Sequence, residues 1–183
     1  MLPIAAHKPG VLEGAKVIAD RLTAAGVRVK FDDRDTVSPG WKFNEWELKG
    51  VPVRLEVGPR DLENNQVMVA RRDTFEKFAL PMDGLEGEIE ALLASIQKTM
   101  FEQARDFRDE HTVEVHNYEE LKAAVEGGFA KGMWCGDAAC EEKLKADINA
   151  TTRNMPFDQT PCGDTCCVCG KRATKLMYFA KAY

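Results

Sequence analysis

Apolar residues recur at helical spacing in two parts of the first 110 residues. One series begins at Val11 and ends before Gly26, and a longer one runs from Leu85 to Phe107. A repeat of three or four residues predicts amphipathic helices. Residues 83–110 also contain eight acidic and three basic side chains. The exposed face of the second helix therefore accounts for the net charge of −5.

Alternating apolar residues predict strands before and between these helices. The predicted strands cover residues 2–6, 27–31, 51–57, 66–71 and 75–80. Ser38 and Pro39 are typical of a helix start, and this helix should end at Gly50. Helix, turn and strand alternate, which predicts an α/β domain. Because no turn or cap precedes Leu2, we expect the sequence to begin inside its first strand.

The long helix should close this first domain near His111, which divides the chain into residues 1–111 and 112–183. A helical pattern spans residues 118–130, and residues 178–179 lie in a short strand-like run. Residues 149–164 show little periodicity. The second domain is thus expected to be small and α+β, with too few aliphatic residues to stabilise itself without a metal.

Charge and hydropathy narrow the classes of function. The excess of acidic residues argues against a generic nucleic-acid binder with a basic coat, such as a non-specific DNA-binding protein, although it permits a local site. No apolar run approaches the 18 residues of a membrane helix, and the first ten residues lack the features of a secretory signal. We therefore expect a protein without a membrane partner.

All six cysteines lie between Cys135 and Cys169. Such a dense cluster in an otherwise cysteine-free chain favours a metal site in a reducing compartment over disulfides. The pairs Cys135-x4-Cys140 and Cys166-x2-Cys169-Gly170 have the spacing with which two thiolate pairs grip a tetrahedral zinc ion. We predict a structural zinc site with these four ligands.

Alternatives to this site remain. Cys167 could replace Cys166, but the x2 spacing followed by glycine is the commoner zinc knuckle, and we interpret Cys162 and Cys167 as spare thiols. A redox Cys-x-x-Cys normally precedes a helix, whereas Gly170 follows this one, which disfavours thioredoxin-type chemistry. A catalytic zinc would need an open coordination position, which four cysteines do not leave.

No set of residues indicates catalysis. His7, His111 and His116 are scattered without a nucleophile, and phosphate-binding glycine motifs are absent. Residues 41–61 differ, because aromatic side chains alternate there with charges of both signs. Such a surface can stack on unpaired bases and hydrogen-bond their edges. The alternative interpretation is that the two tryptophans pack in the core while the charges are solvated.

Several stretches of this sequence together resemble the C-terminal part of prolyl-tRNA synthetases of the archaeal and eukaryote-like type. They are HKPGV at residues 7–11, DDRDTVSPGWKFNEWELKGVPVRLEVGPRD at residues 32–61, the cysteine pairs, and the ending YFAKAY. The resemblance covers nearly the whole chain. It implies an anticodon-binding domain with a mixed five-stranded sheet and flanking helices, followed by a zinc-stabilised C-terminal domain.

The resemblance also implies a function and a set of site residues. The residues matching Phe43, Glu47, Arg54 and Arg60 lie, in that family, where the two guanines of the anticodon are read. The implied parent enzyme is a cytoplasmic, homodimeric ligase that uses ATP to attach proline to its tRNA. Its catalytic domain would precede this segment, so we expect this chain alone to be inactive. The alternative is a stand-alone RNA-binding or regulatory module with the same fold.

Overall fold

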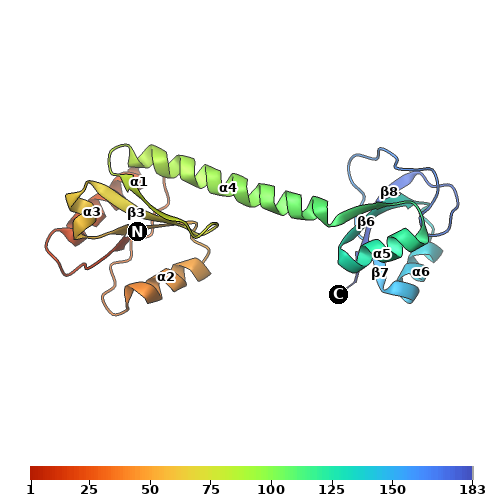
Figure 1. Cartoon of the computed structure of the whole chain (residues 1–183), viewed down its shortest axis with the longest axis horizontal. Helices are drawn as coiled ribbons and strands as arrows, with labels where there is room; N and C mark the ends of the chain where they lie inside the picture. The colour runs from red at the N-terminus through yellow and green to blue at the C-terminus, as the bar shows by residue number, and fades with distance from the viewer. Residues whose placement is uncertain (183) are drawn as a thin grey trace. The chain divides into compact units, whose positions relative to one another are not determined.

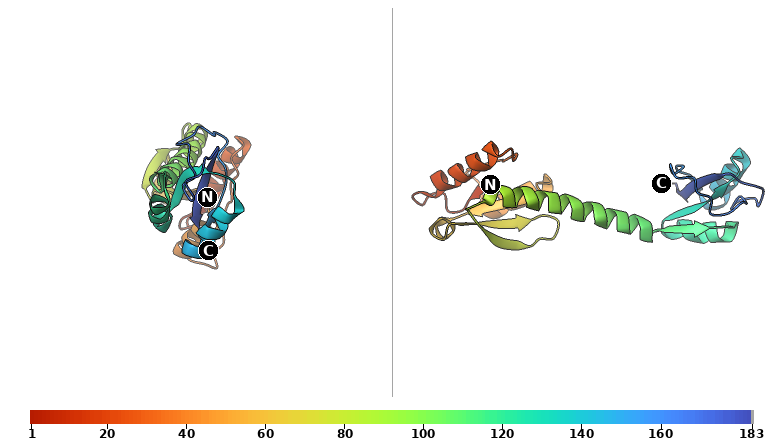
Figure 2. Two further views of the ribbon diagram at one scale, coloured as in Figure 1. Left: turned by 90° about the vertical axis from the view of Figure 1, so that its right-hand side faces the viewer. Right: turned by 90° about the horizontal axis from the view of Figure 1, so that it is seen from above.

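The computed structural model describes residues 1–182, which form two compact units, Met1–Glu102 and Gln103–Tyr183. The first unit contains β1 (Leu2–Pro3), α1 (Val11–Ala24), α2 (Pro39–Leu48), β2 (Val53–Val57), α3 (Pro59–Glu63), β3 (Gln66–Arg71), β4 (Lys77–Pro81) and most of α4 (Leu85–Glu110). Figure 2 shows α4 as one unbroken helix, and the division between the units falls within it. No helix in the described part of the chain is long and apolar enough to cross a membrane.

The first sheet has the order β1-β2-β3-β4, in which β1 and β2 are parallel and the other pairs antiparallel. Alternate residues of a strand point to opposite faces. Leu55 and Val57 of β2 belong to one buried cluster with Ile18 of α1 and Ile89 of α4, so both helices cover that face. Arg54 and the residues in step with it point to the other face. In Figure 1, α2 lies on the side of this sheet away from α4.

The α/β class with mixed sheets is confirmed, with one difference in strand number. The resemblance implied five strands, whereas the first sheet pairs four. In the described part of the chain, the expected strand at residues 27–31 forms no ladder: its backbone bonds to Leu22, near the end of α1, and to Met1. The Met1 amino group donates to the Lys30 carbonyl at 2.9 Å, and the Asp32 N–H donates to the Met1 carbonyl at 3.1 Å. Two hydrogen bonds are too few for a strand pair.

The predicted helices of the first unit are present, and their ends follow local rules. Ser38 begins α2 by accepting a hydrogen bond from the Trp41 N–H at 3.3 Å, with Pro39 at the first helical position. The sequence interpretation missed the short helix α3, which follows Gly58 and whose first turn is closed by Asp61 Oδ2 accepting from the Gly58 N–H at 2.8 Å.

The second unit contains β5 (Thr112–Val115), α5 (Tyr118–Gly127), β6 (Phe129–Trp134), α6 (Ala138–Ile148), β7 (Ala150–Thr152) and β8 (Lys175–Lys181). Its sheet has the order β5-β6-β8-β7, and only β5 and β6 are parallel. The predicted helix at residues 118–130 was too long, because the chain turns at Gly128 and continues as β6. The expected strand-like run at residues 178–179 lies inside β8.

The core of the second unit is larger than the sequence suggested. Leu121 of α5, Leu144 of α6, and Leu176 and Phe179 of β8 are all fully or almost fully buried. Three cysteines, Cys140, Cys166 and Cys167, belong to the same cluster. Short elements supply this core, one to three buried apolar residues each, which is why no long hydrophobic pattern marks it in the sequence. The cysteine cluster is therefore continuous with the hydrophobic core.

Candidate nucleic-acid interface and candidate metal centre

Helix α2 is held against the first unit by a buried carboxylate, Asp32, which is 2% exposed. Its side chain accepts from Arg34 Nε at 2.8 Å, from Arg34 Nη2 at 2.6 Å and from Trp46 Nε1 at 2.8 Å. The buried Lys42 ammonium lies 3.8 Å from the carboxylate and donates to the Asp32 carbonyl at 3.2 Å. The Arg34 hydrogen bonds, followed by the Trp46 bond and the Lys42 charge, hold the pKa of Asp32 well below its usual range.

Three of the four predicted RNA-binding residues meet on the face of the sheet opposite α1 and α4. Arg54 Nη1 donates to Glu47 Oε1 at 2.6 Å, and its guanidinium carbon lies 4.0 Å from the centre of the Phe43 ring. Arg54 Nε donates to Glu56 Oε1 at 3.0 Å. Lys77 from β4 donates to the other Glu56 oxygen at 2.6 Å. The guanidinium is thus oriented by two carboxylates and one ring.

The surroundings make this cluster accessible from one side. A shallow pocket lies between α2 and the ends of β2 and β3, and it is lined by Phe43, Trp46, Glu47, Val51, Arg54, Ala70, Arg71 and Arg72. Ala70 is the direct neighbour of Arg54 across the strands. The Glu47 side chain is 40% exposed, compared with 17% for Arg54. The carboxylate of the pair is therefore the more open to a ligand.

Arg60, the fourth predicted residue, is not part of this pocket. It is exposed on α3, which begins directly after β2. The pocket instead includes Arg72, which lies between the predicted strands at residues 66–71 and 75–80. Arg72 Nε donates to the Glu47 carbonyl at 2.9 Å. No periodic pattern in the sequence includes Arg72, because it lies just beyond β3, and its side chain joins the site through a carbonyl at the end of α2.

The tryptophans of this stretch differ in exposure. Trp41 is 49% exposed, with the Arg34 guanidinium 5.3 Å from its ring centre, whereas the indole N–H of Trp46 is used to hold Asp32. The alternative interpretation, in which both tryptophans pack in the core, is therefore wrong for Trp41. Of the two tryptophans, Trp41 is the more open to stacking on a base.

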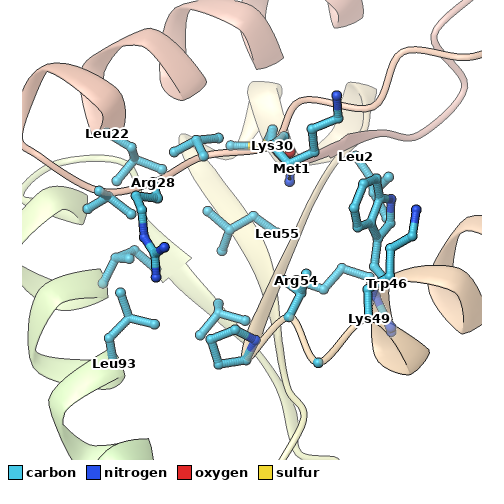
Figure 3. A pocket seen from close by; sticks show the side chains of 17 residues that line it. Met1, Leu2, Leu22, Arg28, Lys30, Trp46, Lys49, Arg54, Leu55 and Leu93 are labelled. Carbon is cyan, nitrogen blue, oxygen red and sulfur yellow. Dashed lines mark hydrogen bonds between the residues drawn. The ribbon is translucent and has the colours of Figure 1, made fainter.

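A larger cavity of about 470 Å³ lies on the other side of Trp46 and Arg54. Figure 3 shows Leu22, Leu55 and Leu93 around it, with Arg54 and Trp46 at its edge. Most of its lining is aliphatic, and its polar side chains come from scattered lysines and arginines rather than from a convergent set. We therefore place the candidate interface at the pocket beside Phe43 and Glu47.

The four predicted zinc ligands are brought together in the second unit. Cys135 follows β6, Cys140 lies in the first turn of α6, and Cys166 and Cys169 flank a turn before β8. Their sulfur atoms all lie within 4.8 Å of one another, with Cys135 Sγ 3.6 Å from Cys140 Sγ and 3.8 Å from Cys169 Sγ. Sulfurs about 2.3 Å from one tetrahedral zinc ion are about 3.8 Å apart. The donor set and its spacing fit that metal.

The turn between Cys166 and Cys169 has the local features of a knuckle. The Gly170 N–H donates to the Cys166 carbonyl at 2.8 Å, and Gly170 has the positive φ of 71° that this closure requires. The backbone N–H of Lys171 lowers the pKa of the Cys169 thiol. Burial raises the pKa of the Cys140 thiol.

The two remaining cysteines lie outside the cluster of four sulfurs. Cys167 is buried, and its N–H donates to the Met133 carbonyl at 2.9 Å. Its side chain packs against β6, where a Cβ added at Gly132 would lie 3.1 Å from its sulfur. Cys162 is half-buried. Adjacent residues 166 and 167 thus point to different surroundings.

Comparisons with known proteins agree with these two units. Residues 1–92 match the family described as "Anticodon binding domain", and residues 118–183 match "Prolyl-tRNA synthetase, C-terminal". Over 185 aligned positions that cover the whole chain, it is 51% identical to the proline–tRNA ligase of Alkaliphilus oremlandii and 52% identical to that of Clostridium novyi. The chain spans 38% of the length of each of these relatives.

A solved structure extends the likeness to three dimensions. The crystal structure of prolyl-tRNA synthetase from Cryptosporidium parvum, complexed with L-proline and AMP, superimposes with a TM-score of 0.87 at 33% sequence identity. The match covers 96% of this chain and 38% of that one. The chain therefore belongs to the anticodon-binding domain family and carries, after that domain, the C-terminal domain of prolyl-tRNA synthetases.

Proposed function

We propose that the first unit binds the anticodon loop of proline tRNA through Phe43, Glu47, Arg54 and Arg60. The observation that carries this proposal is the arrangement around Arg54, whose guanidinium lies on the Phe43 ring and is bound by Glu47 and Glu56. Opposite charges and an aromatic face meet in one pocket, which is the chemistry that unpaired bases require. The family match over residues 1–92 supports the same assignment.

The chemistry of guanine fits this set of donors and acceptors. Arginine can present paired N–H groups to guanine O6 and N7, and a glutamate can accept from the guanine N1–H and N2–H. In the free protein Glu47 and Arg54 bind each other. A guanine that binds both side chains would replace the hydrogen bond between Glu47 and Arg54. Because that bond already holds the two side chains close together, they are positioned before the base binds. Arg60, on α3 beyond the pocket, is available to a neighbouring nucleotide.

We further propose that the chain is the C-terminal part of a cytoplasmic proline–tRNA ligase, a class II aminoacyl-tRNA synthetase. Activation of proline with ATP would occur in a catalytic domain of the same polypeptide, and the parent enzyme would be a homodimer. The relatives named above and the bound L-proline and AMP of the Cryptosporidium parvum protein support this assignment. In this role the present segment is a specificity and folding module with no catalytic residue of its own.

For the second unit we propose a structural zinc ion held by Cys135, Cys140, Cys166 and Cys169. Four thiolates fill a tetrahedral ion and leave no open position for a substrate. Because three of the core residues of this unit are cysteines in or beside the cluster, metal binding there adds directly to the stability of the folded unit. We also retain the division at residues 111 and 112 as our proposal for the domain boundary.

Binding of anticodon stem-loops tests the proposed RNA site. The protein is titrated with a proline tRNA stem-loop and with one in which the anticodon guanines are replaced. Arg54→Ala and Arg60→Ala should each lower the preference for guanine by about 1–3 kcal/mol, or roughly 5- to 150-fold, since each removes a base-reading donor. Arg28→Ala is the matched control, because Arg28 is exposed in the same unit but does not line this pocket.

Two results would contradict the assignment. If the wild-type protein binds both stem-loops equally, the first unit does not read the anticodon guanines. If the wild type prefers guanine and both variants keep the wild-type ratio, the base-reading residues lie elsewhere. Circular dichroism of each variant separates these outcomes from loss of fold.

A further inference from the structure

Arg72 differs from the other cations of the pocket in having no carboxylate partner. Arg54 is paired with Glu47 and Glu56, and Arg71 Nη2 lies 2.7 Å from Asp73. Among residues 1–182, by contrast, no acidic oxygen lies within salt-bridge distance of Arg72. Lys77 balances the second carboxylate of Arg54, because it lies 2.6 Å from Glu56, so these paired groups neutralise one another. Arg72 is then left as one unbalanced positive charge, on an exposed side chain at the rim of the pocket.

The orientation of this side chain is nevertheless fixed. Arg72 Nε donates to the Glu47 carbonyl at 2.9 Å, at the C-terminal end of α2, where unpaired carbonyls attract cations. The Arg72 N–H donates to the Pro52 carbonyl at 3.0 Å, which fixes its backbone as well. With Nε committed, both terminal nitrogens of the guanidinium are free of hydrogen bonds to residues 1–182 and can donate to a ligand. A fixed, charged pair of donors suits a phosphate group.

We propose that Arg72 binds a backbone phosphate of the RNA strand whose bases enter the pocket. This inference rests on the proposed function and assigns different roles to Arg54 and Arg72. Arg54, neutralised by its carboxylates, reads a base edge through hydrogen bonds, whereas Arg72 supplies uncompensated charge that holds the strand in register. Phosphate contacts position a strand without reading its sequence. Arg72 is accordingly a positioning residue that contributes affinity rather than guanine preference.

The salt dependence of binding tests this role. Each neutralised phosphate adds about 0.7–0.9 to the slope of log affinity against log salt concentration. Between 50 and 200 mM salt, the wild type should therefore lose about threefold more affinity than Arg72→Gln. At low salt the variant should bind the guanine stem-loop and the guanine-replaced stem-loop more weakly by the same factor. Arg72→Lys keeps the charge and should retain the wild-type slope.

Arg28→Gln is the matched control, since it also removes an exposed arginine from the first unit without touching this pocket. A wild-type slope in Arg72→Gln would overturn the proposal, as would a selective loss of guanine preference, which would make Arg72 a base reader. If the wild type itself fails to distinguish the two stem-loops, the proposed function is wrong. If the wild type does distinguish them but Arg72→Gln has the same salt slope as Arg28→Gln, only the assignment of Arg72 is wrong.

Discussion

The position of α2 depends on Asp32, and replacing this residue by asparagine should be costly. The carboxylate is 2% exposed and faces Lys42, whose side chain is 8% exposed. Asparagine keeps the shape and one acceptor but removes the charge. Lys42 is then left as a buried ammonium without a counter-ion, while Arg34, at 39% exposed, can return to water. Breaking a buried pair on one side costs about 3–5 kcal/mol. Because the asparagine oxygen can still accept from Trp46, we expect about 3 kcal/mol.

Asp33→Asn provides a matched control next in the chain. Asp33 is exposed, and changes at exposed positions are usually within about 0.5 kcal/mol. Urea unfolding of both variants is followed by tryptophan fluorescence in a Trp134→Phe background, where only Trp41 and Trp46 of the first unit report. The reasoning fails if Asp32→Asn lies within about 1 kcal/mol of the control.

The stability difference between the wild type and Asp32→Asn should also depend on pH, in a direction that the pKa of Asp32 determines. Arg34 and its neighbours lower the pKa of Asp32 in the folded protein. The ionised Asp32 therefore contributes fully to the free energy of unfolding above the pKa of the unfolded chain, near 4, and this contribution is lost as the pH falls toward the lower pKa of the folded protein. The difference in unfolding free energy between the wild type and Asp32→Asn should be constant at neutral pH and should narrow below about pH 4. A difference that stays constant down to pH 2 would show that the charge of Asp32 does not stabilise the fold.

Two further predictions concern the second unit. Purified protein should contain one zinc ion per chain. The variant Cys169→Ser should lose the zinc and have a less stable second unit, whereas Cys167→Ser should keep the zinc. Metal analysis that finds zinc in Cys169→Ser but not in Cys167→Ser would show that Cys167 is the ligand and Cys169 is not. The variant Gly128→Ala should destabilise the second unit by about 1–3 kcal/mol or more, because the added Cβ would lie 2.2 Å from the His111 carbonyl oxygen. Gly127→Ala is the control, since its Cβ would meet nothing within 4 Å, and equal unfolding midpoints for the two variants would contradict the prediction.

Local sequence signals predicted those parts of the molecule that local geometry determines. Helix α4 was predicted because its apolar residues repeat over many turns, and α2 because its start carries a capping serine and a proline. Strand β5 was missed, since it is only four residues long and lies between polar residues, so the alternation of Val113 and Val115 is too short to stand out. The cysteine pairs could be assigned because each pair closes one short turn or helix start.

The charged network around α2 could not be predicted in the same way. Asp32 lies in a run of charged residues that is typical of a turn, and its partners Lys42 and Trp46 follow ten and fourteen residues later on a helix. Nothing in the spacing of these residues shows that the chain folds back on itself there. Arg72 was missed for a related reason, since its bond to the Glu47 carbonyl joins segments that are 25 residues apart.

The charge balance of the chain determines how much each contact in the proposed interface matters. With a net charge of −5, the protein has little long-range attraction for RNA, so the encounter cannot depend on a broad basic surface. Affinity must then come from a few oriented groups, and most of the cations near Phe43 are already neutralised by carboxylates. Such pairs read hydrogen-bonding patterns well but release few counter-ions. Binding of a proline tRNA stem-loop should accordingly depend weakly on salt, and the part that does depend on salt should trace to Arg72.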